Sequence, residues 1–444
     1  MEAGKGRAFW RSFTRTPGID KVWLDGRVRA ELAESNAQIG TPAGWDAGLT
    51  GKGVTVAVLD TGADLGHPDL AGRVSTAKSF IDGQEVADRN GHGTHVTSTV
   101  GGSGAASDGE EKGVAPGADL AVGKVLSDQG SGSESQIIAG MEWAARDVHA
   151  RIVSMSLGST EPSDGTDPMA QAVNTLSKET GALFVVAAGN TGAPSSVGSP
   201  GAADAALTVG AVDSADQAAW FTSAGPRYGD NALKPDLAAP GVDILAARSG
   251  LVEGSGPYTS MSGTSMATPQ VAGVAALLAE QHPDWTGARL KDALMSSSKQ
   301  LDASAYTLGA GRVSVPDAVR ATVTATGSAD LGFHRWPYDA DEPVTRTVTY
   351  TNSSGTPVEL RLSVRGAPDG VATLADDTLT VPAHGTASTT VTGDGSKAPV
   401  GETSGRIVAT DPAGDTVAHT VFGLVKEEER YTLTVHVKDL SRCV

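Results

Sequence analysis

The sequence predicts an α/β fold, a doubly wound and mostly parallel sheet, followed by a C-terminal antiparallel β-sandwich. The sheet is indicated by short apolar runs that alternate with amphipathic segments between residues 54 and 321. The sandwich is indicated by period-two runs rich in Val and Thr from about residue 325 onward. With 444 residues, 39% of them hydrophobic, the chain has the length and composition for two or three domains with large cores.

Five short apolar runs bounded by Gly, Asp or Asn are typical of buried parallel strands. They are residues 54–60, 120–126, 152–158, 183–190 and 206–212. Between them, residues 134–149 and 168–179 have the spacing of crossover helices. Reactive groups of such sheets gather where loops leave the carboxyl ends of the strands. Asp60, Gly158 and Asn190 each close a predicted strand, so we expect functional groups there.

A densely apolar helix is predicted within residues 262–280, and it begins at Ser265 after a turn of small residues. The first N–H groups of a helix lack internal partners and its dipole is positive there, so negative charge forming beside Ser265 would be stabilised. Serine is also a favoured helix cap, and this segment alone leaves both interpretations open. Two further helices are predicted at residues 285–297 and 316–321.

The C-terminal part of the chain is predicted to form a series of short strands separated by turn residues. These runs are residues 346–352, 358–364, 378–383, 387–393, 406–411 and 416–424, with a last strand-like stretch at 430–438. The predicted organisation is a lead-in (1–40), an α/β domain (41–322), a sandwich (323–426) and the start of a further module or a tail (427–444).

Composition excludes several classes of function. The net charge of −18 argues against a nucleic-acid-binding surface, and no stretch of about 18 apolar residues predicts a membrane span. The single cysteine, Cys443, cannot form an internal disulfide. The N-terminus lacks the apolar region of a secretory signal, which fits either a cytoplasmic protein or a chain whose signal lay upstream.

Three short segments hold polar residues between glycines beside apolar elements: VLDTGAD with Asp60, NGHGTHV with His92, and GTSMATP with Ser265. An acid, an imidazole and a hydroxyl are the parts of a nucleophilic triad, in which the imidazole takes the hydroxyl proton and the acid orients the imidazole. Each residue alone also fits a turn or cap. His95 could form a metal pair with His92, but no further His or Cys lies at ligand spacing, so no metal site is predicted.

With AAGN at Asn190, these motifs make residues 40 to 320 resemble the subtilisin-family (subtilase) serine proteases, in particular secreted actinobacterial members. The chain order Asp, His, Ser is the one that this family shows. The resemblance implies a serine endopeptidase that hydrolyses peptide bonds through an acyl-enzyme on Ser265. In it, Asp60 orients His92, His92 acts as base and then as acid, and Asn190 forms the oxyanion hole with the N–H of Ser265.

The resemblance also implies how protein or peptide substrates bind. Ser156, Leu157 and Gly158 would pair with the substrate backbone as an added strand. The primary pocket would be formed by residues 187–191 and Gly198. None of these is acidic, and an acidic group is what a Lys or Arg side chain would need. We therefore expect an apolar or aromatic residue before the scissile bond.

Two departures from the family pattern are visible. Gln270 stands where many members carry His; it lies in the helix, so only packing consequences are expected. The loop at residues 80–89 shows no calcium-binding insertion of the family type. The chemistry requires no cofactor, whereas structural calcium bound elsewhere by carbonyl groups is left open, because such sites leave little trace in a sequence.

The lead-in at residues 21–40 resembles the junction between an inhibitory propeptide and the mature enzyme in the secreted relatives. Residues 1 to about 30 would then be the tail of the chain's own propeptide, and the enzyme would be extracellular; a cytoplasmic subtilase is the alternative. Two further alternatives are a catalytically silent binding protein with the same fold and a dedicated processing protease for one precursor.

Overall fold

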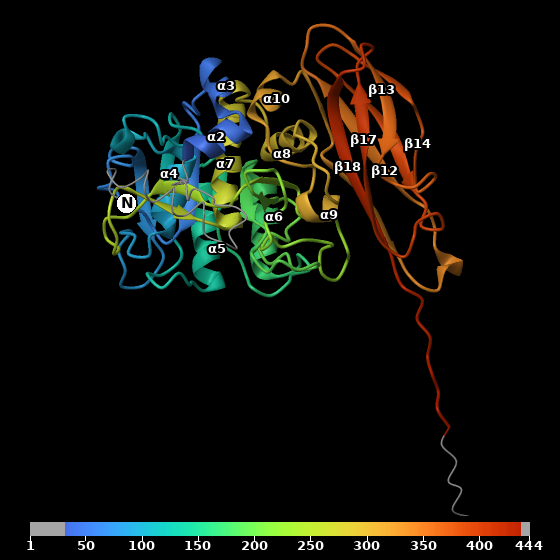
Figure 1. The fold of residues 1–444 in the computed structure, drawn as a ribbon, viewed down its shortest axis with the longest axis horizontal. Helices are drawn as coiled ribbons and strands as arrows, with labels where there is room; N and C mark the ends of the chain where they lie inside the picture. Colours follow the sequence, from blue (N-terminus) through green and yellow to red (C-terminus); the bar gives the residue numbers. More distant parts are fainter. Residues whose placement is uncertain (1–31, 437–444) are drawn as a thin grey trace, which may run out of the picture. The chain divides into compact units, whose positions relative to one another are not determined.

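The computed structural model describes residues 32–436 (Figure 1). Its main feature is a seven-stranded sheet in the order β2-β3-β1-β4-β5-β6-β7. Every pair of neighbours is parallel, as predicted. The strands are β1 (Thr55–Asp60), β2 (Val74–Ser79), β3 (Asp119–Lys124), β4 (Ile152–Met155), β5 (Leu183–Ala187), β6 (Leu207–Val212) and β7 (Leu237–Pro240). Two of these strands were not predicted: β2, an edge strand whose four middle residues are exposed, and β7, which is only four residues long.

Helices cover both faces of the sheet, because alternate strand residues point to opposite sides. In β1, Val56 and Val58 pack in one hydrophobic cluster, together with α4 (His92–Gly101), α7 (Thr264–Gln281) and α8 (Gly287–Ser296). Ala57 and Leu59 pack in the other cluster. Its helices are α5 (Glu134–Glu142), the π-helical turn η2 (Trp143–Asp147) and α6 (Pro168–Thr180). The predicted crossover helix at 134–149 is therefore an α-helix that ends in a π-helical turn.

The strand order changes direction at β1. From β1 the chain passes to β2 and β3 on one side, and then crosses to β4 on the other side of β1. A crevice forms at such a switch point, outside the carboxyl ends of the two neighbouring strands. Asp60 ends β1 and Ser156 directly follows β4, so the topology brings both residues to the same crevice.

Helix α7 is buried over nearly its whole length, as its dense apolar sequence predicts. Helix α2 (Leu32–Ile39) joins the same core through Leu32 and Ile39, and α3 (Thr41–Asp46) follows it. Part of the predicted lead-in is thus packed into this core, while residues 1–31 lie outside the described residues. The position of a maturation cleavage stays a prediction.

Smaller elements complete this part of the chain. They are the helix η1 (Ala105–Ser107), the antiparallel hairpin β8 (Ile244–Ala247) and β9 (Tyr258–Met261), and the helices α9 (Ala305–Leu308) and α10 (Val315–Arg320). None of the helices among the described residues has the length and apolar character needed to cross a membrane.

The C-terminal sandwich has one sheet in the order β10-β12-β16-β14 and another in the order β11-β18-β17-β13-β15; β17 and β18 lie side by side in Figure 1. Each run predicted between residues 346 and 424 contains a whole strand or at least half of one. The pairing differs at β11, which lies parallel to β18 rather than antiparallel. The elements are β10 (Val323–Ala325), β11 (Ser328–His334), η3 (Tyr338–Ala340), β12 (Val344–Asn352), β13 (Val358–Arg365), β14 (Ala372–Leu374), β15 (Thr378–Val381), β16 (Thr386–Gly393), β17 (Gly401–Thr410) and β18 (Thr416–Lys426).

The predicted final strand at residues 430–438 is wrong over the part that is described. Residues 427–436 have no secondary structure, and residues 437 and 438 lie outside the described range. An alternating apolar pattern forms a strand only where a neighbouring strand supplies hydrogen bonds. No strand of the described chain pairs with this segment.

Candidate active site

Asp60 and His92 form a hydrogen-bonded pair at the crevice. Asp60 is the last residue of β1 and fully buried, and His92 is the first residue of α4 with 24% of its side chain exposed. His92 Nδ1 lies 2.8 Å from Asp60 Oδ1, which also accepts the N–H of Thr61 at 2.7 Å. A carboxylate acceptor at Nδ1 places the proton of the neutral imidazole on that nitrogen. The other ring nitrogen, Nε2, is then free to accept a proton.

Two glycines of the motifs allow this pair to form. Gly62 has a φ of +99°, and a Cβ on it would overlap the carbonyl oxygen of Val86. A Cβ on Gly93 would overlap the carbonyl oxygen of Gly62. Both positions therefore exclude any side chain. The loop after β1 can pack directly on the first turn of α4 only because both residues are glycine.

The electrostatic surroundings of His92 favour its protonated form. Burial lowers the pKa of His92, but the charge of Asp60, its hydrogen bond and the charge of Asp88 raise the pKa by more. The net result is a pKa above the ordinary histidine value. A base with a raised pKa holds a transferred proton more firmly, which suits a group that receives a proton and later returns it.

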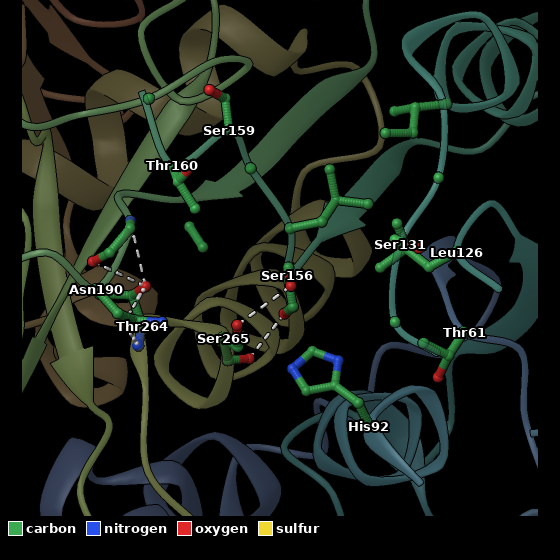
Figure 2. Close-up of a pocket in the computed structure, with 18 of the residues that line it drawn as sticks. Thr61, His92, Leu126, Ser131, Ser156, Ser159, Thr160, Asn190, Thr264 and Ser265 are labelled. Carbon is green, nitrogen blue, oxygen red and sulfur yellow. Dashed lines mark hydrogen bonds between the residues drawn. The ribbon is translucent and has the colours of Figure 1, made fainter. Parts of the chain in front are cut away.

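Ser265 is fixed at the start of α7 by a reciprocal contact with Ser156, the residue that follows β4. Pro269 has no N–H, so the carbonyl of Ser265, four residues earlier, lacks its helical donor. Ser156 Oγ donates to that carbonyl at 2.7 Å, and Ser265 Oγ donates to the carbonyl of Ser156 at 3.1 Å. Figure 2 shows these two bonds and the His92 ring beside Ser265.

The amide of Asn190 is oriented by the residue before Ser265. Asn190 follows β5, and its Oδ1 accepts the N–H of Thr264 at 2.9 Å and the hydroxyl of Thr264 at 3.0 Å (Figure 2). Both donors select the oxygen of the amide, so Nδ2 is the end left as a donor. The N–H of Ser265, the second residue of α7, has no intrahelical partner either.

One cleft of about 690 Å³ brings the predicted residues together. His92, Ser265, Asn190, Gly198 and residues 156–158 all line it, while Asp60 lies buried behind the imidazole. Its apolar lining comes from Leu126, Ile137, Leu157, Met169, Ala187 and Ala188. Figure 2 shows Leu126 and Ser131 across the cleft from Ser156.

Gly198 lies where two segments of the cleft wall meet. The N–H of Ser159 donates to Ser199 O at 2.7 Å, and Pro162 forms a β-bridge with Gly198. A Cβ on Gly198 would overlap the carbonyl oxygen of Ser159. The contact holds the wall next to residues 156–158, the segment predicted to bind the substrate backbone. Only glycine permits it.

His95 and Gln270 have structural contacts outside the cleft lining. His95 is fully buried, with Nε2 2.9 Å from the carbonyl of Ile244, and burial lowers its pKa to about 4. Gln270 donates to the carbonyl of Pro240 at 2.7 Å and packs inside α7. Among the described residues, no group of three or more His, Cys, Asp or Glu side chains has the arrangement of a metal site.

Sequence reasoning missed Asp88, a fully buried carboxylate close to His92. It accepts hydrogen bonds from Thr61, beside Asp60, and from the first turn of α4. The available signal was an Asp just before the Asn90-Gly91 turn that opens a predicted helix, because Asp is a favoured acceptor for the free N–H groups there.

Comparison with known proteins agrees with this arrangement. The model of the subtilase family matches residues 51–311, more than half of the chain. The serine protease AprX of Bacillus subtilis (strain 168) is 42% identical over 334 residues, which are 68% of this chain and 74% of that protein. Subtilisin Savinase of Lederbergia lenta is 39% identical over 288 residues, 64% of this chain and 97% of that protein.

An alkaline protease of Alkalihalobacillus alcalophilus is 39% identical over 312 residues, which are 68% of this chain and 75% of that protein. The family match covers the whole parallel sheet and the helix that carries Ser265. The fold, the acid bonded to an imidazole that lines one cleft with the hydroxyl, and these relatives lead to one conclusion: the chain belongs to the subtilase family and is a serine endopeptidase.

Proposed function

We propose that the chain cleaves peptide bonds through an acyl-enzyme on Ser265, with Asp60 and His92 as its catalytic partners. The observation that carries the proposal is the bond of 2.8 Å from His92 to Asp60, beside Ser265 in one cleft. Ser265 Oγ attacks the scissile carbonyl while His92 Nε2 takes its proton, and Asp60 stabilises the imidazolium. His92 then protonates the leaving amine, and water hydrolyses the acyl-enzyme by the same steps.

Attack requires Ser265 Oγ to turn from its present acceptor, the carbonyl of Ser156, toward the imidazole. This is a rotation about one side-chain bond, and the bond from Ser156 Oγ to the Ser265 carbonyl keeps the backbone in place meanwhile. Substrate binding would favour the rotation, because the arriving peptide occupies the space beside residues 156–158. All groups that take part belong to the chain, so the proposal involves no cofactor.

Asn190 Nδ2 and the N–H of Ser265 are the proposed donors to the oxyanion. Replacement of Asn190 by alanine removes one donor, and we expect kcat to fall about 10²–10³-fold, as for the corresponding donor in subtilisin. KM should change little, because the donor acts on charge that develops in the transition state. Steady-state kinetics on a chromogenic peptide measure both constants. Gln300→Ala, outside the cleft, is the control; unchanged turnover in Asn190→Ala would remove the assignment.

The lining of the cleft supports a preference for apolar residues before the scissile bond. Residues 187–191 and Gly198 carry no charge, and Glu134 is the one carboxylate in the described lining. In a peptide library analysed by mass spectrometry, we expect cleavage after apolar or aromatic residues in many sequence contexts. This experiment tests hydrolysis and pocket preference together. Cleavage confined to a single sequence would instead favour a dedicated processing protease.

A variant without the Glu134 charge tests whether this carboxylate affects the preference for the residue before the scissile bond. If Glu134 attracted basic residues to the position before the scissile bond, wild type would cleave after Lys or Arg and Glu134→Gln would lose that cleavage. We expect no such difference between the two enzymes. Glu142→Gln is the matched control, since Glu142 lies on the same helix but pairs with Arg146 at 2.9 Å outside the cleft lining.

Secretion and inhibition by a propeptide stay proposals. Both rest on the resemblance of residues 21–40 to a propeptide junction, and most of that segment lies outside the described residues. Mass spectrometry of the protein secreted by its natural host would give the N-terminus of the mature chain and test both proposals.

A further inference from the structure

Asp88 is a fully buried carboxylate in the loop that leads into α4, four residues before His92. Its side chain lies between the two segments that carry the proposed acid and base. The loop itself is anchored, because Ser249 Oγ donates to the carbonyl of Asp88 at 2.7 Å. A buried charge in this position is unfavourable unless hydrogen-bond donors surround it.

Five donors surround this carboxylate. Oδ1 accepts the Thr61 hydroxyl at 2.9 Å and the N–H groups of Asn90 and Gly91 at 3.1 and 2.8 Å. Oδ2 accepts the N–H of Thr94 at 2.7 Å and the hydroxyl of Thr94 at 2.6 Å. The N–H groups are main-chain donors, and the two hydroxyls donate as well. Such a set fits an ionised carboxylate, which can only accept.

These bonds connect the strand end that carries Asp60 to the helix start that carries His92. The Thr61 hydroxyl donates to Asp88 and at the same time accepts the N–H of Gly93 at 2.8 Å. Thr61 and Gly93 are the direct chain neighbours of Asp60 and His92. Asp88 therefore holds in place the backbone next to Asp60 and the backbone next to His92.

We propose, on the basis of the function proposed above, that Asp88 is a positioning residue that holds Asp60 and His92 in register and stabilises the positive charge that His92 gains during catalysis. It touches neither substrate nor the reacting atoms, since it does not line the cleft. Its contribution reaches the reaction through the orientation of His92 and through its charge.

The charged groups around His92 show in which direction the charge of Asp88 shifts the pKa of His92. Burial lowers the pKa of His92, whereas Asp60 and Asp88 raise it. His95, one helical turn further, is itself buried with a pKa of about 4 and therefore neutral near pH 7. Lys124 on β3 donates to the carbonyls of Thr61 and Ala87 at 2.5 and 3.5 Å, and its charge is paired with Asp128 at 2.9 Å. Loss of the charge on Asp88 must therefore lower the pKa of His92.

Asp88→Asn tests the proposal, because it keeps the size of the side chain but removes the charge and turns an NH₂ toward a donor. We expect kcat to fall about 10–100-fold, the range for a small misplacement of catalytic groups, with KM nearly unchanged. The acid limb of the kcat/KM profile should move to lower pH, because neutral His92 is the active form and its pKa falls. Kinetics from pH 5 to 9 measure both effects.

Asp69→Asn is the matched control. Asp69 is also fully buried, accepts the hydroxyl of Tyr258 at 2.9 Å and the N–H of Ala106 at 2.8 Å, and has no bond to Thr61 or to α4. It should lower the melting temperature without moving the acid limb. If Asp88→Asn behaved in the same way, with the kcat and the pH profile of wild type, Asp88 would be only a structural residue and the proposal would be overturned.

Thr61→Val separates the positioning effect of Asp88 from the effect of its charge. It is also the variant to test if Asp88→Asn does not fold. It removes the hydroxyl bridge but leaves the carboxylate, so kcat should fall while the acid limb moves less than in Asp88→Asn. A wild-type kcat in Thr61→Val would overturn the positioning role. NMR titration of the His92 imidazole needs no turnover, so it tests the effect of the Asp88 charge even in an inactive protein. Inactivity of the wild-type protein would overturn the proposed function, not the effect of Asp88 on the pKa of His92.

Discussion

Replacement of Ser265 by alanine is expected to abolish peptide hydrolysis almost completely. In subtilisin, a member of the same family, removal of the nucleophilic serine lowers kcat by about 2 × 10⁶. The same loss is expected here, because Ser265 Oγ is the proposed nucleophile and His92 is its proposed base. KM should stay near its wild-type value, since the proposed substrate contacts at residues 156–158 and in the pocket are unchanged. Steady-state kinetics on a chromogenic peptide measure the change.

Ser262→Ala is the control for this variant. Ser262 lies in the same turn before α7, but its hydroxyl bonds to Asp243 at 3.3 Å and to the N–H of that residue at 2.9 Å, outside the cleft lining. Its kcat should be close to that of wild type. Substantial hydrolysis by pure Ser265→Ala protein would contradict the assignment of the nucleophile.

Asp60→Asn is expected to lower kcat about 10⁴-fold while the fold persists. The amide fits the space of the carboxylate and its oxygen still accepts the N–H of Thr61, but the amide carries no negative charge. It therefore cannot stabilise the imidazolium that forms when His92 takes the proton of Ser265. Circular dichroism checks the fold and steady-state kinetics measure the loss.

The double variant Asp60→Asn/Ser265→Ala extends this test. Residues that act as one unit have non-additive effects, so the double variant should be no slower than Ser265→Ala alone. Additive losses would mean that Asp60 contributes independently of the nucleophile, which would contradict its role as the residue that orients His92.

The main groups of the site could be predicted because each lies where an element begins or ends. A polar residue directly after an apolar run, as with Asp60 and Asn190, is visible in one sequence. The same holds for Ser265 at the start of an apolar helix. The parallel topology then brings such positions to one edge of the sheet, so their grouping follows from the order of elements.

The supporting contacts could not be predicted, because they depend on neighbours in space. The reciprocal bonds between Ser156 and Ser265 require β4 to lie beside the start of α7 and Pro269 to free one carbonyl. The bond between Asp88 and Thr61 spans 27 residues and joins two loops. Neither loop has a periodic pattern that would indicate its path.

The fold, like the site, could be predicted only where a local residue pattern indicates an element. Central strands such as β1 are apolar throughout and were found, whereas the edge strand β2 has a mostly exposed sequence without that pattern. The parallel pairing of β11 with β18 depends on the path of the chain between domains, which local residue patterns do not encode. The segment 430–436 shows the opposite case, an alternating pattern without a partner strand.

The central claim is that Ser265 is a nucleophile activated by His92, and labelling with a fluorophosphonate tests it most directly. After digestion and mass spectrometry, the adduct should lie on Ser265 in wild type and be absent from Ser265→Ala. His92→Ala should react far more slowly than wild type. An adduct on another residue, or a wild-type protein that hydrolyses peptides but leaves Ser265 unlabelled, would contradict the account.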